Sequence, residues 1–153
     1  MEFIIILGAK YLFALVLLGA IIVGIMLPKE RRLSYLVAAI ITGIFALIFT
    51  KIAGTLYFDP RPFTHGVHAL IPHEADNGFP SDHTVLSISA AVISLTANRK
   101  YGIGLFALAL IVGLCRVLSG IHSPLDILTG ILIGLIAAFL GYKISSGFLR
   151  PKA

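Results

Sequence analysis

Residues 101–126 read YGIGLFALALIVGLCRVLSGIHSPLD, an apolar run that closes on Arg116, His122 and Asp126. About 20 helical residues cross the roughly 30 Å hydrocarbon core of a membrane, so the run 101–118 predicts a membrane helix. Charged groups at the end of such a helix are costly unless they are paired or face water. The stretch therefore predicts a membrane-spanning helix that delivers polar side chains to one end.

The rest of the chain has the same character. Of its 153 residues, 58% are hydrophobic and only 12% are charged, and the mean hydropathy is +1.01. This composition excludes an ordinary soluble globular protein, and the apolar runs exceed the ten-residue alternation of barrel strands. We expect an all-α integral membrane protein, a single domain over residues 1–153, with about five transmembrane helices at 3–27, 33–58, 83–97, 101–118 and 124–147. The third run is short and rich in serine, so we expect it inside the bundle.

Basic residues gather in alternate connections between these runs. If the chain crosses five times, they all lie on one side, which the positive-inside rule makes cytoplasmic. The N-terminus is then outside and the C-terminus inside, and the loops 59–82 and 119–123 face the extracytoplasmic side of the cell membrane. The net charge of +5 thus follows the membrane and does not indicate nucleic-acid binding. The basic residues in question are Lys29, Arg31, Arg32, Arg99, Lys100, Lys143, Arg150 and Lys152.

His122 and Asp126 form the first candidate pair. His122 lies just before a helix start at Ser123-Pro124, and Asp126 follows one turn into that helix. An aspartate so placed can accept a hydrogen bond from one imidazole nitrogen and leave the other free as a base or nucleophile. Arg116, at the end of the preceding helix, can meet phosphate oxygens with two parallel donors. Alternatively, Asp126 only caps the helix and His122 is an ordinary loop residue.

Two further polar groups lie in the loop 59–82 and on the predicted helices that flank it. Ser81 and His83 stand at a predicted helix N-terminus, where free backbone donors and the helix dipole favour an anion. Arg61 lies between two prolines, and Lys51 precedes it on the second helix. The alternatives are a helix cap with a solvent-facing histidine, a lysine that extends to the membrane surface, and an arginine that pairs with Asp59 or a lipid phosphate.

Together these three groups resemble the signature of the type 2 phosphatidic acid phosphatase (PAP2) superfamily, KxxxxxxRP, then PSGH, then SRxxxxxHxxxD. The third element fits with Cys115 in place of the serine, and the second fits with Asp82 in place of the glycine. The first fits at Arg61-Pro62, but Gly54 stands at the expected lysine position and Lys51 lies one turn earlier. The matching residues are Arg61, Pro62, Pro80, Ser81, His83, Arg116, His122 and Asp126.

The segments 79–84 and 51–54 look most like the bacitracin-resistance-type undecaprenyl pyrophosphate phosphatases. The resemblance implies a metal-independent phosphatase, without a cofactor, that removes the terminal phosphate of a polyprenyl (undecaprenyl) diphosphate. It also implies that His122 attacks phosphorus and becomes a phosphohistidine, that Asp126 orients it, and that His83 protonates the leaving oxygen. The phosphate would be bound by Lys51, Arg61, Ser81 and Arg116, with Asp82 in the same pocket as a helix-capping residue.

Other functions stay open at this point. The enzyme alternatives are a broader lipid phosphatase, acting on phosphatidic acid or phosphatidylglycerol phosphate, and a related lipid phosphotransferase. The non-enzyme alternative is a lipid-phosphate binder or transporter, although transporters usually place charges near the middle of the membrane between repeated halves. His65, His68 and His73, with Glu74 and Asp76, match no strong metal-ligand spacing, so we expect no metal site. A homo-oligomer is compatible with the sequence.

Overall fold

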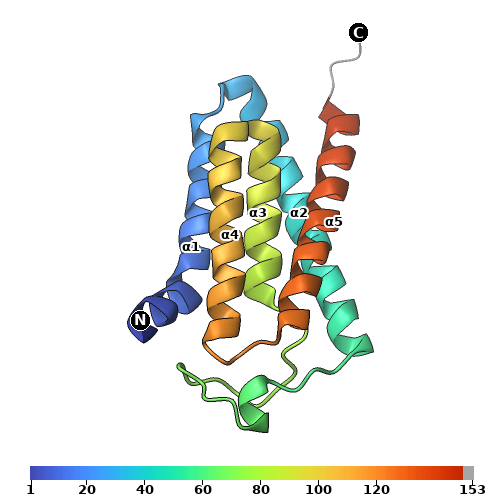
Figure 1. The fold of residues 1–153 in the computed structure, drawn as a ribbon. Coiled ribbons are helices and arrows are strands. Elements are labelled where there is room, and N and C mark those ends of the chain that lie inside the picture. Colours follow the sequence, from blue (N-terminus) through green and yellow to red (C-terminus); the bar gives the residue numbers. More distant parts are fainter. Residues whose placement is uncertain (150–153) are drawn as a thin grey trace.

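The computed structural model describes the backbone of residues 1–149 and the side chains of residues 1–146. Arg150 and Lys152, two of the basic residues on which the predicted orientation in the membrane rests, lie outside the described residues. The chain is all-helical in this part, as predicted (Figure 1). Its elements are α1 Glu2–Met26, α2 Lys29–Leu56, the 3-10 helix η1 Pro62–His65, α3 Asp82–Ala97, α4 Arg99–Leu118 and α5 Pro124–Leu149.

α3 is the central helix of the bundle. It packs against α1, α2, α4 and α5, whereas α1 and α2 make few contacts with each other. Its serines Ser87, Ser89 and Ser94 are buried, which confirms the prediction that this short run lies inside the bundle. At 16 residues, α3 spans only about 24 Å. The other four helices are long and apolar enough to cross a membrane, so the chain is a multi-pass membrane protein.

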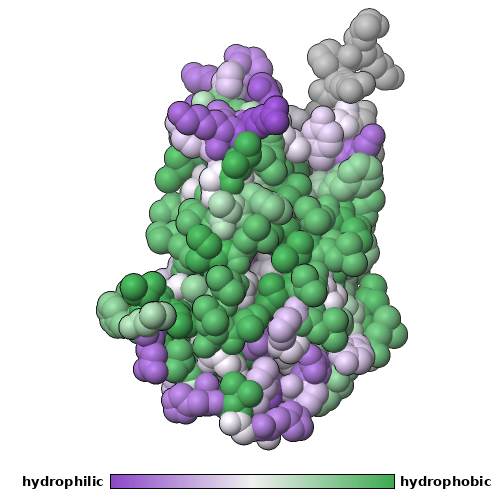
Figure 2. All heavy atoms as spheres, in the orientation of Figure 1, coloured by the Kyte–Doolittle hydropathy of each residue, from purple (hydrophilic) through white to green (hydrophobic). Residues whose placement is uncertain are grey.

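The ends of the helices form two separate polar regions. The N-terminus, the loop 57–81 and the connection between α4 and α5 lie at one end, which we call the site end (Figure 1). The α1–α2 connection, the α3–α4 connection and the last turns of α5 lie at the other, which we call the basic end. Figure 2 shows hydrophilic side chains at both ends of the visible face and a hydrophobic band between them.

Local sequence explains where the helices stop. Gly120, with a φ of +74°, ends α4 in the left-handed conformation, and a Cβ there would lie 2.5 Å from the carbonyl oxygen of His68. Asn98 is the single residue between α3 and α4. Its side chain caps the start of α4 by accepting hydrogen bonds from Lys100 N and Tyr101 N. α2 begins at Lys29 rather than at 33, so the first basic residues belong to the helix.

Candidate active site

The connection between α4 and α5 holds His122 against Asp126. The His122 Nδ1 lies 3.0 Å from Asp126 Oδ2, and both side chains are buried, with 3% and 1% exposure. The same oxygen accepts Ser123 N at 2.8 Å, while Asp126 N donates to Ser123 Oγ at 3.2 Å. This reciprocal pair caps α5 in the way that a Ser-x-x-Glu capping box does. Because a carboxylate only accepts, Nδ1 carries the proton and Nε2 presents its lone pair.

Two buried arginines face that lone pair. Arg116 Nη2 lies 3.1 Å from His122 Nε2, and Arg61 Nη1 lies 3.4 Å from it. Backbone carbonyls orient both guanidinium groups, since Arg61 Nη1 donates to Ile121 O at 2.9 Å and Arg116 Nη1 donates to Ala9 O at 3.3 Å. Arg116 Nε is buried without a partner. Two guanidinium groups beside one imidazole, one of them with an unused donor, make a buried site suited to an anion.

The electrostatics of this buried site favour the neutral form of His122. Burial lowers the pKa of the imidazole, and the guanidinium groups of Arg116 and Arg61 lower it further. The hydrogen bond to Asp126 acts in the opposite direction and raises the pKa, but the net direction is down. Nε2 is therefore unprotonated near neutral pH and available as a nucleophile.

The second predicted group lies at the start of α3, beside the first. Ser81 is fully buried, and its backbone N donates to Asp126 O at 3.2 Å. Ser81 is the N-cap residue, but its hydroxyl makes no cap hydrogen bond and instead accepts from Thr84 Oγ1 at 3.1 Å. His83 packs edge-on against Phe13 of α1, with ring centroids 4.3 Å apart. Asp82 is exposed in the first turn of α3.

The loop 57–81 is joined to the site by contacts that the sequence did not indicate. Ser123 Oγ donates to Asp59 Oδ2 at 2.6 Å, and Gly78 N donates to Asp59 O at 2.9 Å. The Asn77 side chain accepts from Asp59 N and donates to the carbonyls of residues 54 and 57. The alternative that pairs Arg61 with Asp59 is wrong, because Arg61 Nε donates to Asp76. Within this hydrogen-bond network, the sequence predicted only that Ser123 starts a helix.

Lys51 does not join the network. It is exposed on α2, and no hydrogen bond or ion pair involves it among the described residues. The family's lysine position, Gly54, lies against the loop, since a Cβ there would meet Phe79 O at 3.1 Å. A long side chain at 54 would therefore have to displace the backbone just before Pro80. Among the described residues, no three histidine, cysteine or acidic side chains are close enough to hold a metal ion.

A buried histidine–carboxylate pair that faces two arginines inside a helical membrane bundle is suited to bind an anionic group and attack it. A model of the PAP2 superfamily matches residues 32–150, and the chain belongs to this superfamily.

The similar proteins narrow the class. The chain is 38% identical over 140 residues to the undecaprenyl-diphosphatase BcrC of Bacillus subtilis, covering 91% of this chain and 70% of that protein. It is 33% identical over 131 residues to the putative undecaprenyl-diphosphatase YbjG of Escherichia coli, covering 84% and 65%. The chain thus spans about two thirds of the length of these relatives. The crystal structure of Aquifex aeolicus LpxE superimposes with a TM-score of 0.63 at 26% identity, over 91% of this chain and 81% of that one. The resemblance to this family is confirmed, and these relatives indicate a phosphatase.

Proposed function

We propose that this protein hydrolyses the terminal phosphate of a polyprenyl diphosphate, undecaprenyl diphosphate being the substrate that its relatives' names suggest. The observation that carries the proposal is the position of His122 Nε2, 3.1 Å from Arg116 Nη2 and 3.4 Å from Arg61 Nη1, with Nδ1 held by Asp126. A neutral imidazole with its lone pair directed between two cations can attack an anionic phosphorus.

The reaction divides into two displacements. In the first, His122 Nε2 forms a bond to the terminal phosphorus, the bridging P–O bond breaks, and the lipid monophosphate leaves with a proton from His83. In the second, water attacks the phosphohistidine and gives its proton to His83, which releases inorganic phosphate. Asp126 stabilises the charge that Nδ1–H acquires in both steps. A bound phosphate accepts the donors that the two arginines otherwise direct at Nε2.

Cationic side chains of the site offset the negative charge that spreads onto the phosphate oxygens in the transition state. Arg61 and Arg116 provide fixed guanidinium donors, and Ser81 stands at the N-terminus of α3 beside them. We assign no step to Lys51 or Asp82, because both are exposed and neither takes part in the hydrogen-bond network of the site among the described residues.

The first experiment measures phosphate release by the purified protein from polyprenyl diphosphates, polyprenyl monophosphates, phosphatidic acid and phosphatidylglycerol phosphate, each with EDTA present. We expect the diphosphates to be preferred and the activity to survive EDTA. Preference for a glycerophospholipid would replace the substrate proposal, and lipid binding without phosphate release would favour a binding protein.

A second experiment tests the nucleophile. With substrate labelled at the terminal phosphate and an alkaline quench, the wild type should carry label and His122→Ala should not. His65→Ala, which changes an exposed histidine of η1, is the matched control and should keep both label and turnover. Turnover above about 1% in His122→Ala would contradict the assignment.

We also propose that the site end faces the extracytoplasmic side. The support is charge, because Lys29, Arg31, Arg32, Arg99 and Lys100 lie at the opposite end. Cysteines introduced at Glu74 and at Lys100, in separate variants, should be labelled by an impermeant maleimide in intact cells only at 74. The native Cys115 is buried and provides the background.

A further inference from the structure

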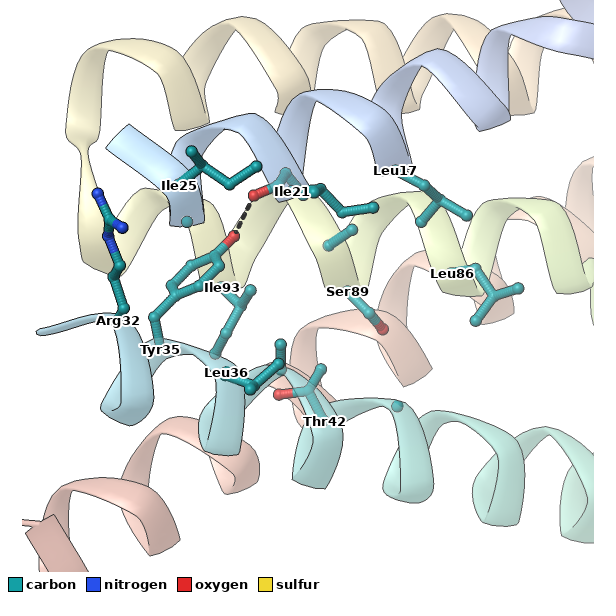
Figure 3. A pocket seen from close by; sticks show the side chains of 15 residues that line it. Leu17, Ile21, Ile25, Arg32, Tyr35, Leu36, Thr42, Leu86, Ser89 and Ile93 are labelled. Carbon is teal, nitrogen blue, oxygen red and sulfur yellow. Dashed lines mark hydrogen bonds between the residues drawn. The ribbon is translucent and has the colours of Figure 1, made fainter. Parts of the chain in front are cut away.

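A long apolar groove lies between α1 and α2, with α3 as its floor (Figure 3). Its volume is about 530 Å³, and its walls are side chains such as Leu17, Ile21, Leu36, Leu86 and Ile93. The groove exists because α1 and α2 separate where they cross α3, leaving few contacts between them. It is distinct from the candidate active site, none of whose residues line it.

The length of the groove matches one leaflet of a bilayer. On α2 its lining runs from Arg32 to Gly43, which is about 16 Å of helix at a rise of about 1.5 Å per residue. Half of a hydrocarbon core of roughly 30 Å is about 15 Å. Because Arg32 lies near the start of α2, the groove occupies the half of the bundle that belongs to the basic end. Water does not fill an apolar groove in hydrocarbon, so a lipid chain is its natural occupant.

The outer end of the groove carries a cation with free donors. Arg32 Nε donates to Leu27 O at 2.9 Å, and its two Nη atoms have no hydrogen-bond partner among the described residues. Tyr35, by contrast, is fully engaged, since its hydroxyl donates to Ala20 O at 2.8 Å and meets Ser94 Oγ at 3.0 Å. The other charged residues described at the basic end are Lys29, Arg31, Arg99, Lys100 and Lys143, against the single acid Glu30.

We propose that this groove binds an anionic phospholipid from the leaflet at the basic end, with one acyl chain between α1 and α2 and the phosphate on Arg32. A guanidinium with two free Nη groups suits bidentate binding of a phosphate. An isoprenoid tail that enters from the site end brings no charge to Arg32, which is why the observations favour a phospholipid over the substrate. The proposal is independent of the reaction at His122.

The test measures lipid binding to the full chain in detergent, by thermal shift and by native mass spectrometry, with dioleoyl-phosphatidylglycerol and dioleoyl-phosphatidylcholine. Phosphatidylglycerol should raise the melting temperature and stay bound, and phosphatidylcholine should do so at least fivefold less well. Arg32→Gln should weaken phosphatidylglycerol binding about tenfold, the effect of losing one charge-assisted contact. Arg31→Gln is the matched control, because Arg31 does not line the groove.

A second pair of variants tests the groove itself. A Cβ at Gly43 meets nothing within 4 Å, so Gly43→Leu fills the groove without disturbing the backbone packing. Gly104 on α4 is equally open and lies outside the groove, so Gly104→Leu is its control. Gly43→Leu should lose phosphatidylglycerol binding, and Gly104→Leu should keep it.

Four results would overturn the proposal. Equal binding of the two lipids would show that the groove does not select an anionic headgroup. Unchanged phosphatidylglycerol binding in Arg32→Gln would show that Arg32 does not bind the phosphate. A higher KM of Gly43→Leu for long polyprenyl diphosphates but not for farnesyl diphosphate, without loss of phosphatidylglycerol, would assign the groove to the substrate tail. A change in oligomeric mass with lipid binding unchanged would assign it to a second copy of the chain.

Discussion

Ser123 donates a hydrogen bond of 2.6 Å to Asp59, and this contact joins the loop before Arg61 to the cap of α5. The same hydroxyl accepts Asp126 N at 3.2 Å. Asp59, Ser123, Asp126 and His122 therefore form a continuous chain of hydrogen bonds that begins in one loop and ends at the candidate nucleophile. Asp59 makes no hydrogen bond to His122, Arg61 or Arg116, so we expect it to act by positioning Ser123 and Asp126.

Removal of Asp59 should slow the reaction without unfolding the protein. Asp59→Ala leaves Ser123 Oγ–H without its acceptor, and a lost hydrogen bond to a charged group costs about 1.5–3 kcal/mol. We expect kcat to fall about 10- to 100-fold with little change in KM, because the binding arginines stay in place. Steady-state kinetics on a polyprenyl diphosphate measure both constants.

Asp59→Asn is the matched control, because its amide oxygen can still accept from Ser123. It should recover at least half of the lost activity. If Asp59→Ala raised KM and left kcat unchanged, or if Asn and Ala were equally impaired, a positioning role would be excluded.

The fall of kcat/KM on the acid side of its pH profile should reflect protonation of His122. Its pKa lies below the ordinary value because of burial and the charges of Arg116 and Arg61. The neutral form of His122 attacks, so on the acid side of the profile activity is lost as pH falls below this lowered pKa. The loss on the basic side belongs to the proton that His83 must carry. We therefore expect the half-maximal point of this acid limb of kcat/KM to lie below about pH 6.5, where a free histidine titrates.

Asp126 supplies the check on this assignment. Asp126 raises the pKa of His122, so the residual activity of Asp126→Asn should show an acid limb displaced to lower pH. A half-maximal point above pH 7 on the acid side of the wild-type profile would contradict a neutral, buried His122.

Two glycines with positive φ should respond differently to alanine. At Gly66, with a φ of +89°, nothing lies within 4 Å of a built Cβ, so Gly66→Ala carries only the left-handed penalty of about 1–2 kcal/mol. At Gly120 the Cβ would also approach His68 O to 2.5 Å. Gly120→Ala should lower the melting temperature further, and it should reduce phosphate release because the connection it distorts holds His122. Equal effects on both measurements would refute this account.

Lys51→Ala should change kcat/KM less than about threefold. Its side chain is exposed and has no partner in the described part of the chain, and single exposed charges contribute little. Arg61→Ala in the same assay is expected to lose more than about 100-fold, which sets the scale for a buried cation proposed to bind the phosphate. A loss of similar size in Lys51→Ala would show that Lys51 contributes to phosphate binding after all.

The fold was predictable because one physical requirement dominates it. Hydrocarbon demands long apolar helices, and all five appear within a few residues of the expected ranges. The largest difference is at the start of α2, where charged residues extend the helix beyond the apolar run. Long basic side chains tolerate this position because they reach toward water from a helix end.

The site was predictable to the extent that spacing determines it. The interval from His122 to Asp126 is one helical turn, so their contact follows from a single cap. The partners of Arg61 and the role of Asp59 depend on how two loops meet, and no local pattern in the sequence encodes that meeting. The contact of Phe13 with His83 joins residues 70 positions apart, and only the packing of α1 on α3 brings them together.

One carboxylate oxygen of Asp126 holds both the first backbone amide of the α5 cap and the imidazole proton. Melting of a single helical turn would therefore release His122, the candidate nucleophile, while the rest of the bundle stays intact. Helix ends open far more readily than packed cores. On heating, this protein should lose turnover some degrees before its helical signal falls, so that its thermal inactivation is a local event.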